Sequence, residues 1–189
     1  MKALIDFAFF MNAGGPINWI IAALYLAVLA LGSNRGVYFW RTRPGGKTAE
    51  GAFPLNQAGR VTRRYIENRT IPKAELDEVI EREGAVIMAE MERGSALLGF
   101  IGTASPLLGL LGTITGLMRA FAAIESLGGN VDIAALSGGI REAMITTATG
   151  LVTAITAAAL AKFFDSLSAA RAREMSLALS LVSAQRSQA

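Results

Sequence analysis

Two apolar stretches decide the fold of this chain: LLGFIGTASPLLGLLGTITGLM at residues 97–118 and AMITTATGLVTAITAAALA at residues 143–161. No charged residue lies within either stretch. A helix rises about 1.5 Å per residue, so each stretch can cross a hydrocarbon core of roughly 30 Å. A helix on the surface of a soluble protein would carry a charged face, which these stretches lack. Both are therefore predicted to span a membrane.

A third transmembrane helix is predicted at residues 16–40. No charge occurs between Asp6 and Arg35, and Pro16 suits the first position of a helix because its missing N–H has no partner there. The preceding residues, 1–15, are expected to form a short amphipathic segment. A cleaved signal peptide is the rival interpretation, and it is disfavoured because the basic cluster follows the apolar run instead of preceding it.

Composition limits the chemistry. Hydrophobic residues make up 52% of the 189 residues and charged residues 17%, and the chain has neither histidine nor cysteine. The usual metal ligands, the usual general base at neutral pH and thiol nucleophiles are therefore absent from the sequence. We expect no catalytic residue, no metal site and no cofactor, and an intramembrane enzyme or transporter is the least favoured alternative. The net charge of +3 comes from interleaved acids and bases, which argues against nucleic acid as a partner.

The distribution of basic residues predicts the orientation. Only Lys2 precedes the first span, whereas eleven basic residues lie between Gly32 and Leu98. By the positive-inside rule, the N-terminus and the link between the second and third spans lie outside, and the large loop and the tail lie inside. Within the loop, Thr70 is expected to cap a helix that begins near Pro72 and runs straight into the second span. From Leu151 onward no glycine or proline occurs, which predicts one long helix.

The second span carries small residues at intervals of three and four. Gly109, Gly112 and Gly116 share one face, and small residues let helix backbones approach closely in lipid. Packing within one chain is one interpretation, and pairing between copies is the favoured one. Pro106 removes a backbone hydrogen bond and is expected to bend or loosen the helix.

The third span carries a polar stripe. At 100° per residue, its members fall within about 40° of one direction. Two interpretations stay open: threonine hydroxyls that bond back to their own helix, and a weakly polar lining for water or an ion. The stripe consists of Glu142, Thr146, Thr149, Thr153 and Thr156.

Both stretches carry the signature of a known family. Residues 105–121 (SPLLGLLGTITGLMRAF) followed by residues 139–155 (GIREAMITTATGLVTAI) resemble the MotA/TolQ/ExbB proton-channel family, with the closest similarity to ExbB and TolQ. The strong part of the resemblance covers residues 93–165. Two departures stand out: Thr156 replaces a proline that is usual in relatives, and Arg119 replaces a residue that is commonly neutral.

The resemblance implies a non-enzymatic motor subunit. Several copies, five in the better understood members, would form a ring around an ExbD/TolR-like single-span partner that carries an essential Asp. The partner would transmit force to a TonB/TolA-like effector. The ion-pathway residues implied by the family are Thr113, Thr147 and Glu142, and Arg119 could pair with Glu142. A flagellar-stator-like torque generator is the alternative, although the cytoplasmic loop is small for gripping a rotor.

The resulting expectation is an all-α polytopic protein of the bacterial inner membrane, with three transmembrane helices and long cytoplasmic helical extensions. Its predicted parts are a periplasmic N-terminal segment (1–15), a first transmembrane helix (16–40), a cytoplasmic loop with a helix (41–94), a second transmembrane helix (95–124), a periplasmic link (125–138), a third transmembrane helix (139–164) and a cytoplasmic helical tail (165–189).

Overall fold

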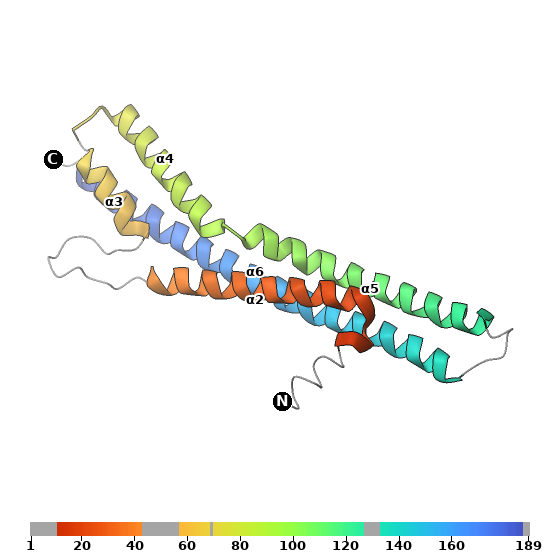
Figure 1. Cartoon of the computed structure of the whole chain (residues 1–189). Helices are drawn as coiled ribbons and strands as arrows, with labels where there is room; N and C mark the ends of the chain where they lie inside the picture. Colours follow the sequence, from red (N-terminus) through yellow and green to blue (C-terminus); the bar gives the residue numbers. More distant parts are fainter. Residues whose placement is uncertain (1–10, 43–56, 69, 127–132, 187–189) are drawn as a thin grey trace. The chain divides into compact units, whose positions relative to one another are not determined.

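The computed structural model describes residues 11–42, 57–68, 70–126 and 133–186. Within these ranges the chain forms helices joined by turns, and no β-strand occurs. The prediction of an all-α fold is confirmed. Figure 1 labels the helices α2 (Gly15–Arg41), α3 (Gln57–Glu67), α4 (Lys73–Glu92), α5 (Ser95–Ser126) and α6 (Ile133–Arg186).

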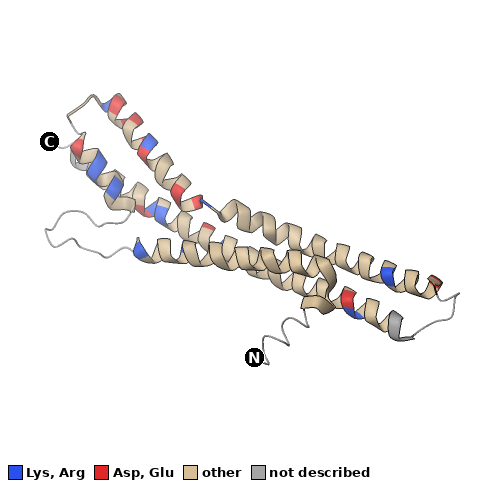
Figure 2. Ribbon diagram, viewed as in Figure 1, with Lys and Arg blue, Asp and Glu red and all other residues tan. Residues whose placement is uncertain are grey.

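Three helical stretches are long and apolar enough to cross a membrane, as predicted: Gly15–Arg41, Lys73–Ser126 and Leu136–Leu181. Figure 2 shows that charged residues concentrate on α3, α4 and the C-terminal part of α6. The chain is therefore a multi-pass membrane protein. Most of the predicted N-terminal segment (1–15) and the central part of the predicted link (125–138) lie outside the described residues.

The chain divides into two compact units, which we treat separately. The first contains residues 1–32 and 97–161, and so holds most of the apolar helical sequence. The second contains residues 33–96 and 162–189.

In the first unit, α5 packs on α6 through positions that have no side chain. An ideal Cβ at Gly116 would lie 3.0 Å from the Gly139 carbonyl oxygen, and one at Gly109 would lie 3.2 Å from the Thr147 Cα. At Gly112 the Thr146 side chain occupies the space that a Cβ would need. The two backbones therefore approach closely, as small residues permit between helices in lipid.

This packing corrects one expectation. The glycine face of α5 was expected to pair copies of the chain, but it contacts α6 of the same chain. The opposite face of α5 carries large exposed apolar side chains, among them Leu107, Ile114 and Met118. Pro106 lies inside α5, and the helix continues on both sides of it.

In the second unit, α4 does not continue into α5. The helix ends at Glu92, Arg93 has non-helical dihedral angles (φ −56°, ψ 120°), and Gly94 has φ +87°. A left-handed conformation is one that glycine adopts readily and other residues rarely do. The expectation of a continuous helix is therefore wrong.

Side chains from other helices satisfy the last carbonyl groups of α4. A nitrogen of Arg35 donates to the Glu90 carbonyl oxygen at 2.9 Å, and the Ser168 hydroxyl donates to the Met91 carbonyl oxygen at 3.2 Å. These bonds replace the intrahelical partners that are lost at a helix end. At the other end of α4 the expected Thr70 cap is also wrong: Pro72 occupies the N-cap position and no side-chain cap bond forms.

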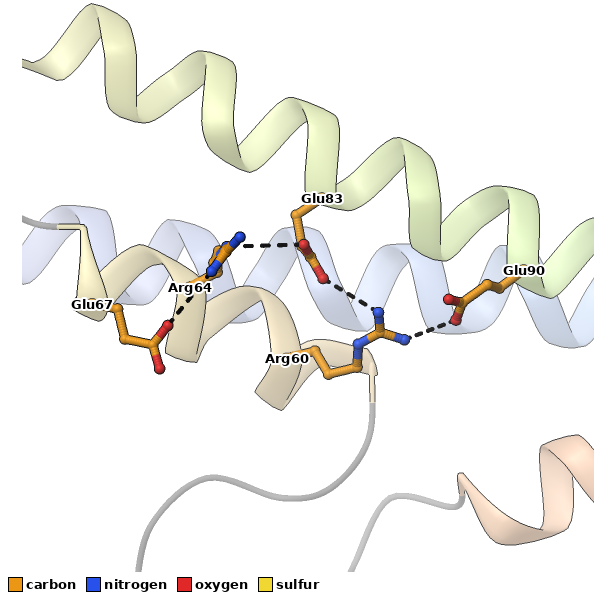
Figure 3. A network of polar contacts seen from close by, with 5 residues as sticks. All are labelled: Arg60, Arg64, Glu67, Glu83 and Glu90. Carbon is orange, nitrogen blue, oxygen red and sulfur yellow. Dashed lines mark hydrogen bonds and ion pairs between the residues drawn. The ribbon is translucent and has the colours of Figure 1, made fainter.

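Helix α3 is tied to α4 by the polar network in Figure 3. Arg60 contacts Glu90 at 2.8 Å and Glu83 at 3.3 Å, and Arg64 contacts Glu83 at 4.0 Å and Glu67 at 3.9 Å. The hydrogen bond to Glu90 raises the pKa of Arg60 above its ordinary value. These groups are partly exposed, so each pair contributes at most about 1 kcal/mol. Burial of apolar side chains is the larger contribution, and on α4 it involves Leu76, Ile80, Ile87 and Met91.

Gly150→Ala tests the close packing of α5 on α6. The new Cβ would lie 2.7 Å from the Ser105 carbonyl oxygen, a backbone atom that cannot move aside cheaply. We expect a loss of stability of about 1–3 kcal/mol, as for other overpacked sites. Thermal unfolding of the detergent-solubilised protein measures it.

The matched control is Gly99→Ala on α5, where no atom lies within 4 Å of the new Cβ. This change should be neutral or stabilising by up to about 1 kcal/mol, because alanine favours the helix. Equal melting temperatures for the two variants would contradict the packing described here.

Candidate functional site

Thr147 lies at the contact between α5 and α6, and Thr113 lies on α5. The Thr147 hydroxyl oxygen is 3.1 Å from the Ala143 carbonyl oxygen of its own helix and 3.3 Å from the Gly109 carbonyl oxygen of α5. Thr113 follows Gly109 by one helical turn on the same side of α5. Its hydroxyl donates to the Leu110 carbonyl oxygen at 2.6 Å. Both threonines are half-buried.

The threonine stripe of α6 lies inside the first unit. Thr146 and Thr153 are buried, and Thr149 is half-buried. Each hydroxyl oxygen lies within hydrogen-bond distance of the carbonyl oxygen four residues earlier, at 2.8 Å, 2.8 Å and 3.1 Å respectively. The single hydrogens of Thr146 and Thr149 have a second acceptor at 2.7 Å, the Gly14 carbonyl oxygen and Asn18 Oδ1. This is the back-bonding that threonine commonly makes inside helices. Thr146 contacts Gly14 and Gly112, and Thr149 contacts Asn18, so part of the stripe packs against neighbouring helices.

Asn18 is a buried polar residue that the sequence interpretation missed. It has no exposed surface, its Nδ2 donates to the Met11 carbonyl oxygen at 3.2 Å, and its Oδ1 accepts from the Thr149 hydroxyl at 2.7 Å. It also lines a largely apolar groove of about 600 Å³ between α2 and α6, together with Thr149 and Thr153. A carboxamide inside the charge-free first span was the available signal, because polar groups are rare at such positions.

Glu142 lies where α2, α5 and α6 meet. Its carboxylate contacts the Arg119 guanidinium of α5. The side chain of Glu142 is 19% exposed and that of Arg119 is 49% exposed. On its other side the carboxylate occupies the space that a side chain at Gly15 would need. Gly15 has φ +70° and begins α2, so glycine is favoured there for both conformation and space.

The described residues contain no cluster of three or more His, Cys, Asp or Glu side chains that could hold a metal ion. The polar groups described above are threonine hydroxyls, the buried Asn18 carboxamide and the Glu142 carboxylate with its Arg119 partner. Such groups can exchange hydrogen bonds with a proton-carrying group.

A double-mutant cycle tests the ion pair. Arg119→Gln, Glu142→Gln and the combined variant should show a coupling of about 0.2–1 kcal/mol in thermal unfolding, because half-exposed pairs are weakened by solvent. The coupling should shrink at high salt. Fully additive single effects would show that the two side chains do not interact.

Comparison with known proteins identifies the family of the chain. The family model described as the MotA/TolQ/ExbB proton channel family matches residues 55–176, which include α3, α4, α5 and most of α6. None of the curated proteins matches the chain. The family match covers more than half of the sequence and includes Thr113, Glu142 and Thr147. The chain therefore belongs to the MotA/TolQ/ExbB proton channel family.

Proposed function

We propose that this chain is the ring-forming subunit of an ExbB/TolQ-like motor in the bacterial inner membrane, driven by the proton-motive force. The observation that carries the proposal is the position of Thr113 and Thr147 in a proton-channel family member. The Thr147 hydroxyl lies at the contact of the two helices that match the family, and Thr113 follows Gly109 of that contact by one helical turn. The chain is not an enzyme, since its family is one of channels.

The ion is proposed to travel on a carboxyl group of an ExbD/TolR-like single-span partner. When protonated, that carboxyl group donates its O–H to a threonine oxygen, which has lone pairs available. When ionised, it needs water or another donor. One proton that moves down a potential of 100 mV releases about 2.3 kcal/mol, which is available to move the partner within the ring. The partner would then pass force to a TonB/TolA-like effector.

Glu142 is proposed to serve the outer end of this pathway. In the proposed topology, residues 1–15 and 125–138 are periplasmic, residues 41–94 and 165–189 are cytoplasmic, and the spans are 16–40, 95–124 and 139–164. Glu142 then lies near the periplasmic start of the third span. Basic residues follow the first span, which supports the cytoplasmic placement of the loop.

Assembly into a ring, with five copies as in the better understood relatives, is supported by the outward apolar faces of two helices. Leu107, Leu110 and Ile114 on α5 and Met144 and Ile155 on α6 are each at least half exposed in one chain. A large apolar surface of this kind fits contact with lipid and with other membrane helices.

The pathway is tested by Thr113→Val combined with Thr147→Val. Valine keeps the shape of each side chain and removes the oxygen, so a buried protonated carboxyl group loses a partner worth about 1–3 kcal/mol. Proton flux into vesicles that hold the chain and its copurified single-span partner should fall by at least about tenfold. Assembly, checked by native mass spectrometry, should persist.

The matched control is Thr115→Val combined with Thr156→Val. Thr115 lies on α5 at about 160° from Thr113, and Thr156 lies on α6 at about 180° from Thr147. Both hydroxyls bond back to their own helices, to the Gly112 and Val152 carbonyl oxygens. Normal flux in the first double variant, or equal loss in the control, would overturn the pathway assignment.

A further inference from the structure

Asn18 ties the start of α2 to α6. We call residues Met11–Gly15, which are three helical residues, Gly14 and the first residue of α2, the N-terminal turn because the chain turns at Gly14. The Asn18 Nδ2 donates to the Met11 carbonyl oxygen of this turn at 3.2 Å, while its Oδ1 accepts from Thr149 of α6 at 2.7 Å. Because Asn18 is fully buried, each half of its amide needs such a partner.

A second bond holds the same turn. The Thr146 hydroxyl oxygen of α6 lies 2.7 Å from the Gly14 carbonyl oxygen. The absence of a side chain at Gly14 makes room for Asn18, because an ideal Cβ at Gly14 would lie 2.6 Å from the Asn18 amide. The turn is thus attached to α6 near both of its ends.

The attached turn determines what lies next to Glu142. Gly15 ends the turn and begins α2, and its missing side chain leaves the space that the Glu142 carboxylate occupies. An ideal Cβ at Gly15 would also lie 3.2 Å from a terminal nitrogen of Arg119. The carboxylate therefore meets a guanidinium and the first residue of a helix, whose N-terminus carries partial positive charge.

We propose that Asn18 is a positioning residue for Glu142. By holding the N-terminal turn on α6, it keeps the Gly15 backbone over the carboxylate and shields that carboxylate from water. An apolar residue of similar size would fill the same volume, so packing alone does not explain a buried carboxamide here. The inference deepens the proposed function, because it concerns access to a residue assigned to the ion pathway.

Asn18→Leu is the first test, on the purified complex in lipid nanodiscs. Removing the amide frees the Met11 carbonyl group, while the Thr149 hydroxyl keeps the Ile145 carbonyl oxygen as a partner. Backbone amides of residues 11–18 should exchange with deuterium about tenfold faster, while those in the middle of α5 stay unchanged. Labelling of Glu142 by a water-soluble carbodiimide should rise relative to the exposed reference carboxylates Glu125 and Asp165.

Thr146→Val cuts the other attachment of the turn and leaves Asn18 intact. It should raise exchange at residues 11–18 and labelling of Glu142 in the same direction. It also provides the test if Asn18→Leu fails to assemble. Combined with Asn18→Leu, it should add less than its separate effect, because both bonds hold one segment.

Asn18→Asp gives a readout that a general loss of stability would not produce. A protonated carboxyl group can donate to the Met11 carbonyl oxygen and accept from Thr149, as the carboxamide does, whereas a carboxylate can only accept. Among the described residues, the hydrogen-bond partners of position 18 are uncharged, and the Arg119–Glu142 pair lies beside Gly15. The turn should therefore be protected in mildly acidic buffer and loosened in mildly alkaline buffer, after correction for intrinsic exchange rates.

Unchanged exchange at residues 11–18, unchanged labelling of Glu142 in Asn18→Leu and Thr146→Val, or an Asn18→Asp variant without a pH step would each overturn the proposal. None of these readouts requires ion flux. If labelling responds as expected but the Thr113 and Thr147 double variant still conducts, the positioning role stands and the proposed pathway fails.

Discussion

The structure of the first unit depends on the absence of side chains where α5 meets α6. Lipid offers no hydrophobic drive for two apolar helices to associate, so close van der Waals contact between backbones must supply much of the attraction. Gly109, Gly116 and Gly150 provide that contact. An ideal Cβ at each of them would lie within 3.2 Å of a backbone atom of the other helix. The placement of Thr147 beside Gly109 follows directly, because a larger residue at position 109 would push α6 outward.

Polar groups follow a second rule at membrane depth, where water is not available to complete a hydrogen bond. Each threonine along the stripe uses a carbonyl oxygen of its own helix, and Asn18 uses both halves of its amide. A similar solution appears in the second unit, where Arg35 and Ser168 complete the end of α4. In both units some polar contacts join segments that are far apart in sequence, such as Asn18 with Thr149 and Arg35 with Glu90.

The number of candidate spans could be predicted from sequence because a charge-free run of this length is rare outside membrane helices. The glycine face of α5 was visible as well, but spacing cannot tell whether a face meets the same chain or another copy. The break after α4 has one local signal, Gly94 itself. The side chains that complete the end of α4, Arg35 and Ser168, lie 59 residues before and 74 residues after Gly94, and no local pattern indicates them. Asn18 was missed for a related reason: its role depends on Met11 and on Thr149 of another helix. Thr113, Thr147 and Glu142 were indicated by family motifs, and their detailed surroundings needed coordinates.

The hydroxyl groups of Thr113 and Thr147 already donate their hydrogens to backbone carbonyl oxygens, so each has only lone pairs left to offer. A group that approaches these positions must then donate a hydrogen bond. A neutral acid does so, and its conjugate base does not. The two threonines would therefore favour the protonated form of a carboxyl group over its ionised form, without a conformational change in this subunit.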